Sequence, residues 1–216
     1  MISFFKAHNT KYLLLFSAFS CVLLAIRFYV EVDGANFLFL TINLFLAWIP
    51  YLISQVFRKE NLSKTILYLS VFMWLLFFPN ALYVVTDLFQ LWPRPKGGIW
   101  FDLIMLFSFA FTSLLLGFGS LQNLEKYFSR RIKNRFKLNL ISFLFIYLGS
   151  FGVYFGRFRR WNSWDILHKP WFYKREGVYF FENPIEDIDF YGTTLLFAIL
   201  VYLLYYGIYN FAKNQQ

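Results

Sequence analysis

Arginine side chains cluster in residues 156–167, which read GRFRRWNSWDIL. The planar guanidinium groups of Arg157, Arg159 and Arg160 match the geometry of phosphate oxygens, which they bind through paired charge-assisted hydrogen bonds. Asn162 adds an amide to this segment, and Trp164 adds a ring of the kind that settles at membrane–water interfaces. We therefore predict that these five residues contact a phosphate-bearing ligand.

Three carboxylates supply a second kind of chemistry. Asp87 lies near the end of the segment FFPNALYVVTDL at residues 77–88, Asp102 lies in WFDL at residues 100–103, and Asp165 follows the arginines. Each is a candidate general base. Asp87 and Asp102 are also the candidates for a divalent cation, which prefers oxygen ligands. No nucleophile elbow, glycine-rich phosphate loop or histidine metal motif accompanies them, so the sequence assigns no reaction and leaves open whether the chain is an enzyme.

The segment before Asp87 contributes two further polar side chains. Asn80 and Tyr83 precede Asp87 at a helical spacing of i, i+3 and i+7, which puts all three on one face. Pro79 disturbs the helix at the same place because it lacks a backbone donor. Asn80 lies at membrane depth, where a polar side chain needs a partner. We predict that Asn80 and Tyr83 belong to the ligand site.

Long apolar runs provide the elements that must position these residues. The chain is 59% hydrophobic and only 15% charged, and its apolar residues form blocks near the ~20 residues that a helix needs to cross a bilayer. We predict an all-α, polytopic transmembrane helical bundle, formed by the single membrane domain 1–216. An exoplasmic loop or short helix should lie at the interface between spans five and six. The six spans are expected at residues 12–30, 37–57, 65–86, 103–124, 138–156 and 190–212.

The distribution of basic residues predicts the orientation. The connection KYFSRRIKNRFK at residues 126–137 is densely basic, and such a short connection is seldom exported. Both termini are therefore expected to be cytoplasmic in a multi-pass protein of the cell membrane. The net charge of +9 comes largely from this connection. At a membrane it favours membrane lipids with anionic headgroups as partners, rather than nucleic acid.

Small residues predict that the spans carrying the candidate site pack closely. Gly152 and Gly156 form a small-xxx-small pair in span five, which Gly149 extends, and Gly117 lies in span four. Close packing of spans three, four and five would bring the polar groups together. A half-buried carboxylate is costly without a partner. We therefore expect Asp87 or Asp102 to hold Arg157.

The segments FFPNALYVVTDL, WFDLIMLFSFAFTSLLLGFGSL and GRFRRWNSWDIL, in this order, resemble the signature of a known family. It is the family of bacterial polytopic membrane proteins named domain of unknown function 1361. The resemblance implies a membrane protein in which the three segments act as a unit, and it supplies no reaction.

Three functions are compatible with these features. The first is an outer-face site that binds or processes an anionic, phosphate-bearing lipid or amphiphile. The second is a small secondary transporter, since six spans divide into two triplets of opposite orientation. The third is a non-catalytic membrane subunit or assembly factor. Clustering of the charged residues at one edge, away from the membrane midplane, favours the first.

Overall fold

The computed structural model describes residues 7–30, 37–91, 99–158, 171 and 188–214. Within these ranges the regular elements are helices, as the sequence predicts. The long ones are α1 (Ala7–Val30), α2 (Phe39–Ser54), α3 (Lys64–Tyr83), α4 (Ile99–Ser129), α5 (Arg135–Phe158) and α8 (Ile188–Asn214). Two shorter 3-10 helices continue α2 and α3, namely η2 (Gln55–Arg58) and η3 (Val84–Leu91). The predicted interfacial element between spans five and six lies outside the described residues, except for Trp171.

Six helical segments are long and apolar enough to cross a membrane, which confirms the predicted six-span, all-α fold. Their outward surfaces carry large apolar side chains such as Phe45, Tyr68 and Leu203, each more than 60% exposed. A soluble monomer rarely exposes so continuous an apolar surface. A lipid bilayer is the solvent that such a surface suits.

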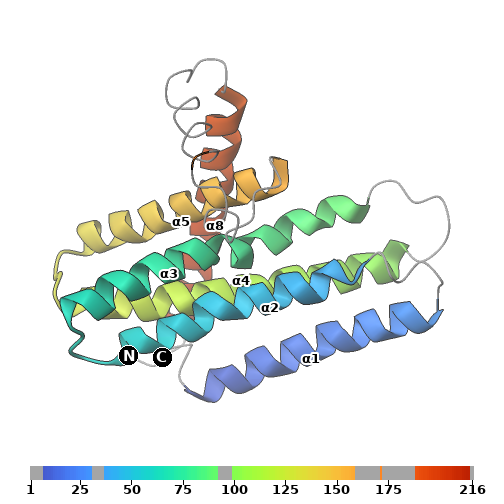
Figure 1. The fold of residues 1–216 in the computed structure, drawn as a ribbon, viewed down its shortest axis with the longest axis horizontal. Helices are drawn as coiled ribbons and strands as arrows, with labels where there is room; N and C mark the ends of the chain where they lie inside the picture. The colour runs from blue at the N-terminus through green and yellow to red at the C-terminus, as the bar shows by residue number, and fades with distance from the viewer. Residues whose placement is uncertain (1–6, 31–36, 92–98, 159–170, 172–187, 215–216) are drawn as a thin grey trace.

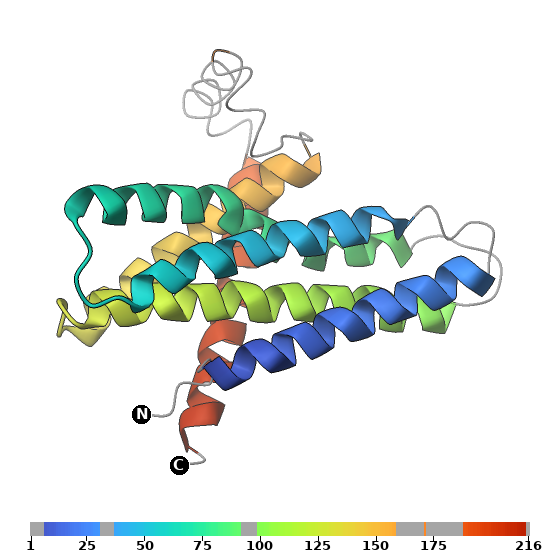
Figure 2. The same cartoon turned by 60° about the horizontal axis from the view of Figure 1, so that its bottom comes forward.

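The helices do not all run in one direction. In Figures 1 and 2, α1 to α5 extend along the long axis of the molecule, whereas α8 crosses them steeply. Aromatic contacts hold α8 in place: the ring of Phe190 lies 4.6 Å from that of Tyr154 in α5, and the ring of Tyr205 lies 5.5 Å from that of Phe118 in α4. The sixth helix therefore has the length and composition of a span without lying parallel to the other five.

Glycines bring α3 close to α4 and α5. A Cβ atom added to Gly152 would lie 2.5 Å from Cγ of Pro79, and one added to Gly149 would lie 2.8 Å from the ring of Phe78. Across the other interface, a Cβ on Gly117 would lie 3.2 Å from Cβ of Ala81. A Cβ at Gly149 or Gly152 would clash, and one at Gly117 would require Ala81 to shift slightly, so the predicted close packing of spans three, four and five is confirmed.

Pro79 does not end its helix. The α-helix continues to Tyr83 and then tightens into η3, in which residues three apart lie on one face. Val84 and Asp87 both point into the protein and are almost completely buried. The change of helix type thus carries a carboxylate into the interior, close to the end of α3.

Two ends of the molecule differ in their charges. The end of α1, the start of α2, η3 and the start of α4 lie together at the right of Figures 1 and 2. This end, called the Arg–Asp end below, contains Arg27, Asp87 and Asp102. The opposite end contains η2 and the turn between α4 and α5, with the basic residues 126–137, and is called the basic end.

Candidate functional site

Arg157, near the end of α5, binds Asp87 of η3. Its Nη1 donates to Oδ1 of Asp87 at 3.1 Å and to the hydroxyl of Tyr83 at 3.3 Å, and its Nη2 donates to the carbonyl oxygen of Thr86 at 2.8 Å. The second carboxylate oxygen of Asp87 accepts from Nδ2 of Asn43 in α2, at 2.9 Å. Both oxygens of this buried carboxylate are therefore engaged, by side chains from two other helices.

The pair is partly shielded by aromatic rings. The Arg157 guanidinium lies 5.6 Å from the ring centre of Tyr83 and 5.9 Å from that of Phe89, within the range of a cation–π interaction. The side chain of Arg157 is 17% exposed and that of Asp87 is 1% exposed. The prediction that a carboxylate holds Arg157 is confirmed, and Asp87 is that carboxylate.

Asp102 has a different arginine. Nε of Arg27 in α1 donates to Oδ1 of Asp102 at 2.6 Å, and Nη2 donates to Oδ2 at 3.2 Å. The side chains are 6% and 8% exposed. This two-point contact joins the end of α1 to the first turn of α4, and the ring of Phe37 lies 5.8 Å from the guanidinium.

This second pair was not predicted from the sequence, and neither Arg27 nor Asn43 is among the predicted site residues. The available signal was the position of Arg27 itself, because an arginine inside an apolar span requires a buried partner. Asn43 carried a similar but weaker signal, as an amide within the second apolar run.

The two pairs lie at the same end of the molecule, where η3 packs against α4. Together they form a set that we call the Arg–Asp layer, made of Arg27, Asn43, Asp87, Asp102 and Arg157. The layer links α1, α2, η3, α4 and α5. Its two arginines balance its two aspartates, so the layer has no net charge, although each member is costly to bury without its partner.

The structure places Asn80 and Tyr83 in different surroundings. Tyr83 joins the layer through its hydroxyl, which accepts from Arg157. Asn80 donates from Nδ2 to the carbonyl oxygen of Phe77 in its own helix, at 3.1 Å. The predicted common face therefore brings Tyr83 and Asp87 to one arginine, while the Asn80 amide donates within its own helix.

Several predicted site residues lie outside the described residues, namely Arg159, Arg160, Asn162, Trp164 and Asp165. Their role in ligand binding or catalysis stays a prediction, as does a catalytic role for Asp87 or Asp102. Among the residues that the structure describes, no group of three or more His, Cys, Asp and Glu side chains is placed to hold a metal ion.

Comparison with known proteins gives one match. No curated protein and no solved structure matches the chain. The model of the family DUF1361, described as a protein of unknown function, matches residues 42–205. This range contains Asn43, Asp87, Asp102 and Arg157, whereas Arg27 precedes it. Because the match covers more than half of the chain, this protein with six membrane-spanning-type helices belongs to the DUF1361 family.

Proposed function

We propose that the chain is a multi-pass protein of the cell membrane that binds a phosphate-bearing amphiphile at its outer face. Both termini would lie in the cytoplasm, which puts the Arg–Asp end in the exoplasm. The dense run of basic residues at the opposite end supports this orientation, since such runs are retained inside. The ligand would come from the outer leaflet, or would approach it from outside.

The observation that carries the proposal is the pairing of Arg157 with Asp87. It fixes the last turn of α5 through three donated hydrogen bonds to η3 and Tyr83. Arg159 and Arg160 follow that turn directly in the sequence. The charge of Arg157 is neutralised by Asp87. The positive charge that binds a phosphate group would therefore come from Arg159 and Arg160, which follow the helix end that this pair holds in place. Anchoring lowers the entropy cost of ordering them around a ligand.

We assign positioning roles to Asp87 and Asp102 in this function. A general base or a metal ligand must be reached by the reacting group or the ion, whereas Asp87 and Asp102 are only 1% and 6% exposed. Each oxygen of these two carboxylates already accepts an N–H from a neighbouring arginine or asparagine. With their charges matched, the two aspartates do not repel an anionic ligand that approaches the same end.

The geometry gives the transporter less support. Arg27 lies in the last turn of α1 and Asp102 in the first turn of α4, so their pair lies near one membrane surface. Transporter sites typically lie near the midplane, at breaks in the helices. Pro79 lies inside a helix that continues past it.

The test is a binding titration of the purified protein with farnesyl phosphate, with uncharged farnesol for comparison. The double variant Arg159→Gln/Arg160→Gln is expected to bind farnesyl phosphate roughly tenfold to a hundredfold more weakly, because it loses charge-assisted hydrogen bonds to the phosphate. The matched control is Lys64→Gln/Lys137→Gln, which removes two exposed lysines at the basic end.

The control should bind farnesyl phosphate like the unmodified protein, and farnesol should bind both doubles equally. Equal affinity of the two double variants for farnesyl phosphate would refute the proposed site. A preference for farnesol over its phosphate would refute the proposed ligand class.

A further inference from the structure

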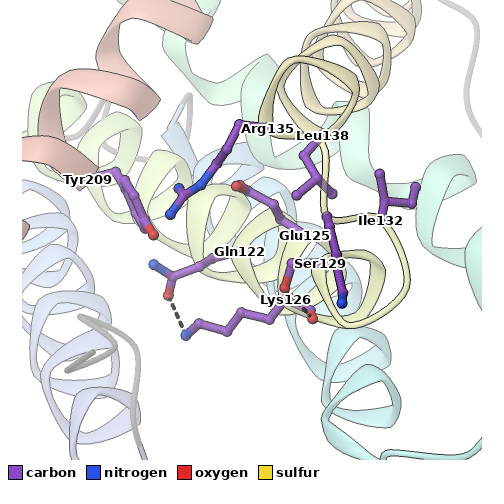
Figure 3. Close-up of a pocket in the computed structure, with 9 residues that line it drawn as sticks. Gln122, Glu125, Lys126, Ser129, Ile132, Arg135, Leu138 and Tyr209 are labelled. Atoms are coloured by element: carbon purple, nitrogen blue, oxygen red, sulfur yellow. Dashed lines mark hydrogen bonds between the residues drawn. The ribbon is translucent and has the colours of Figure 1, made fainter.

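The basic end contains a pocket that has no part in the function proposed above. Its volume is about 210 Å³, and it lies between the end of α4, the start of α5 and the C-terminal part of α8. Figure 3 shows the side chains that surround it, with Arg135 reaching in from α5 and Tyr209 from α8. A water molecule occupies about 30 Å³ in the liquid, so the pocket has room for a tetrahedral oxyanion with some of its hydration.

Cations dominate the pocket lining. Lys126, Lys133 and Arg135 contribute three positive charges, and Glu125 contributes one negative charge. The Glu125 carboxylate accepts a hydrogen bond from the hydroxyl of Tyr205 at 2.5 Å, on the side where α8 packs. Lys126 donates to Oε1 of Gln122 at 3.1 Å (Figure 3). The lining therefore has a net charge of +2 and includes an amide beside one of its cations.

The basic residues next to the pocket contact other groups of the protein, so the pocket differs from a surface that is only rich in basic residues. Arg130 donates from Nη1 to the carbonyl oxygen of Lys59 at 3.1 Å, and Arg131 lies 4.4 Å from the ring centre of Tyr127. Lys133 and Arg135 are exposed, and neither forms an ion pair with any residue that the structure describes. Their donors remain available to an anion in the pocket.

The outer surface of α5 beside the pocket is apolar. Leu138 lines the pocket, and the exposed Phe136 and Leu140 lie on the opposite, outward side of the same helix. A soluble anion gains nothing from such a surface, whereas an acyl chain attached to the anion would lie along it. The combination of a cationic pocket with the apolar outer surface of the neighbouring α5 suits an amphiphile whose head is a phosphate group.

We infer that this pocket binds the phosphate group of an anionic membrane lipid in the leaflet at the basic end. Lys126, Lys133 and Arg135 would donate to the phosphate oxygens, and the lipid tails would run along α5. The inference concerns the opposite end from the proposed ligand site and does not depend on it.

The test measures binding of phosphatidylglycerol and phosphatidylcholine to the purified protein by native mass spectrometry, with inorganic phosphate as a soluble competitor. The protein should prefer phosphatidylglycerol. Lys133→Gln/Arg135→Gln should weaken its binding roughly tenfold to a hundredfold, because charge-assisted hydrogen bonds are lost. Lys64→Gln/Lys137→Gln removes the same net charge outside the pocket and should leave that preference intact.

A second variant keeps the charge constant. Ser129→Trp should obstruct the pocket, which Ser129 lines, and should weaken phosphatidylglycerol binding while the thermal unfolding midpoint stays near that of the unmodified protein. If Lys133→Gln/Arg135→Gln and Lys64→Gln/Lys137→Gln bind phosphatidylglycerol equally well, the inference is overturned. Displacement of the lipid by millimolar phosphate would instead assign the pocket to a soluble phosphate compound, and so would overturn the lipid assignment. The Arg159→Gln/Arg160→Gln variant should retain this binding, which separates the two proposals.

Discussion

Replacing Arg157 with alanine is expected to lower the free energy of unfolding by roughly 3 to 5 kcal/mol. The substitution leaves the carboxylate of Asp87 buried, with Asn43 as its remaining side-chain donor. It also removes donors from the Thr86 carbonyl and the Tyr83 hydroxyl. The measurement is denaturation of the protein in mixed micelles, followed by circular dichroism. Arg130→Ala serves as the control, because loss of an exposed arginine should cost under about 1 kcal/mol.

A double-mutant cycle identifies the partner. Asp87→Asn alone should also be strongly destabilising, but Arg157→Ala/Asp87→Asn should cost much less than the sum of the two single variants. Arg157→Ala/Asp102→Asn should be additive, because Asp102 is held by Arg27. Additivity in both cycles would mean that Arg157 is an interfacial anchor that reaches headgroups, and it would remove the support for an anchored end of α5.

The second large effect is expected at the pair that joins α1 to α4. Arg27→Met should cost roughly 3 to 5 kcal/mol of unfolding free energy, because it strands the carboxylate of Asp102 in a buried site. Asp102→Leu should cost a similar amount because it takes the carboxylate away from the buried Arg27. The double variant Arg27→Met/Asp102→Leu should lie close to the unmodified protein in stability, because an apolar pair of similar volume avoids the desolvation of both ions.

Arg27→Lys gives a sharper comparison. A lysine keeps the charge but cannot reproduce the two-point contact of the guanidinium. The unfolding free energy of the Arg27→Lys variant should therefore lie between those of the unmodified protein and Arg27→Met. A double variant as unstable as the sum of its singles would contradict a simple ion pair at this site. It would indicate instead that each residue is needed for contacts of its own.

These two pairs show how far the sequence leads. Apolar runs predict the six helices because the length of a bilayer-crossing helix is fixed by the bilayer itself. The sequence limits the candidate partners of Arg157 to Asp87 and Asp102, because these two carboxylates are predicted at the same membrane surface as Arg157. The choice between them depends on η3, in which the tightened helix points Asp87 inward, and nothing in FFPNALYVVTDL predicts that change of helix type.

The Arg27–Asp102 pair and the direction of α8 could not be predicted, because the sequence does not specify which helices pack against each other. Arg27 and Asp102 are 75 residues apart, and an apolar run does not specify which other run it packs against. The steep crossing of α8 has a similar origin. Its direction follows from aromatic contacts such as Tyr205 with Phe118 and Phe190 with Tyr154, which length and hydropathy do not encode.

The proposed function depends most directly on the side of the membrane that the Arg–Asp layer faces. The measurement uses single-cysteine variants in a Cys21→Ser background, which removes the one native thiol. Gln90→Cys reports on the exposed part of η3 beside Asp87, and Ser129→Cys reports on the end of α4 at the basic end. A membrane-impermeant maleimide is added to intact spheroplasts of the expression host, and then to permeabilised ones.

The proposal predicts that the Gln90→Cys variant is labelled in intact spheroplasts and that the Ser129→Cys variant is labelled only after permeabilisation. The reverse pattern would place the Arg–Asp layer in the cytoplasm and contradict an outer-face ligand site.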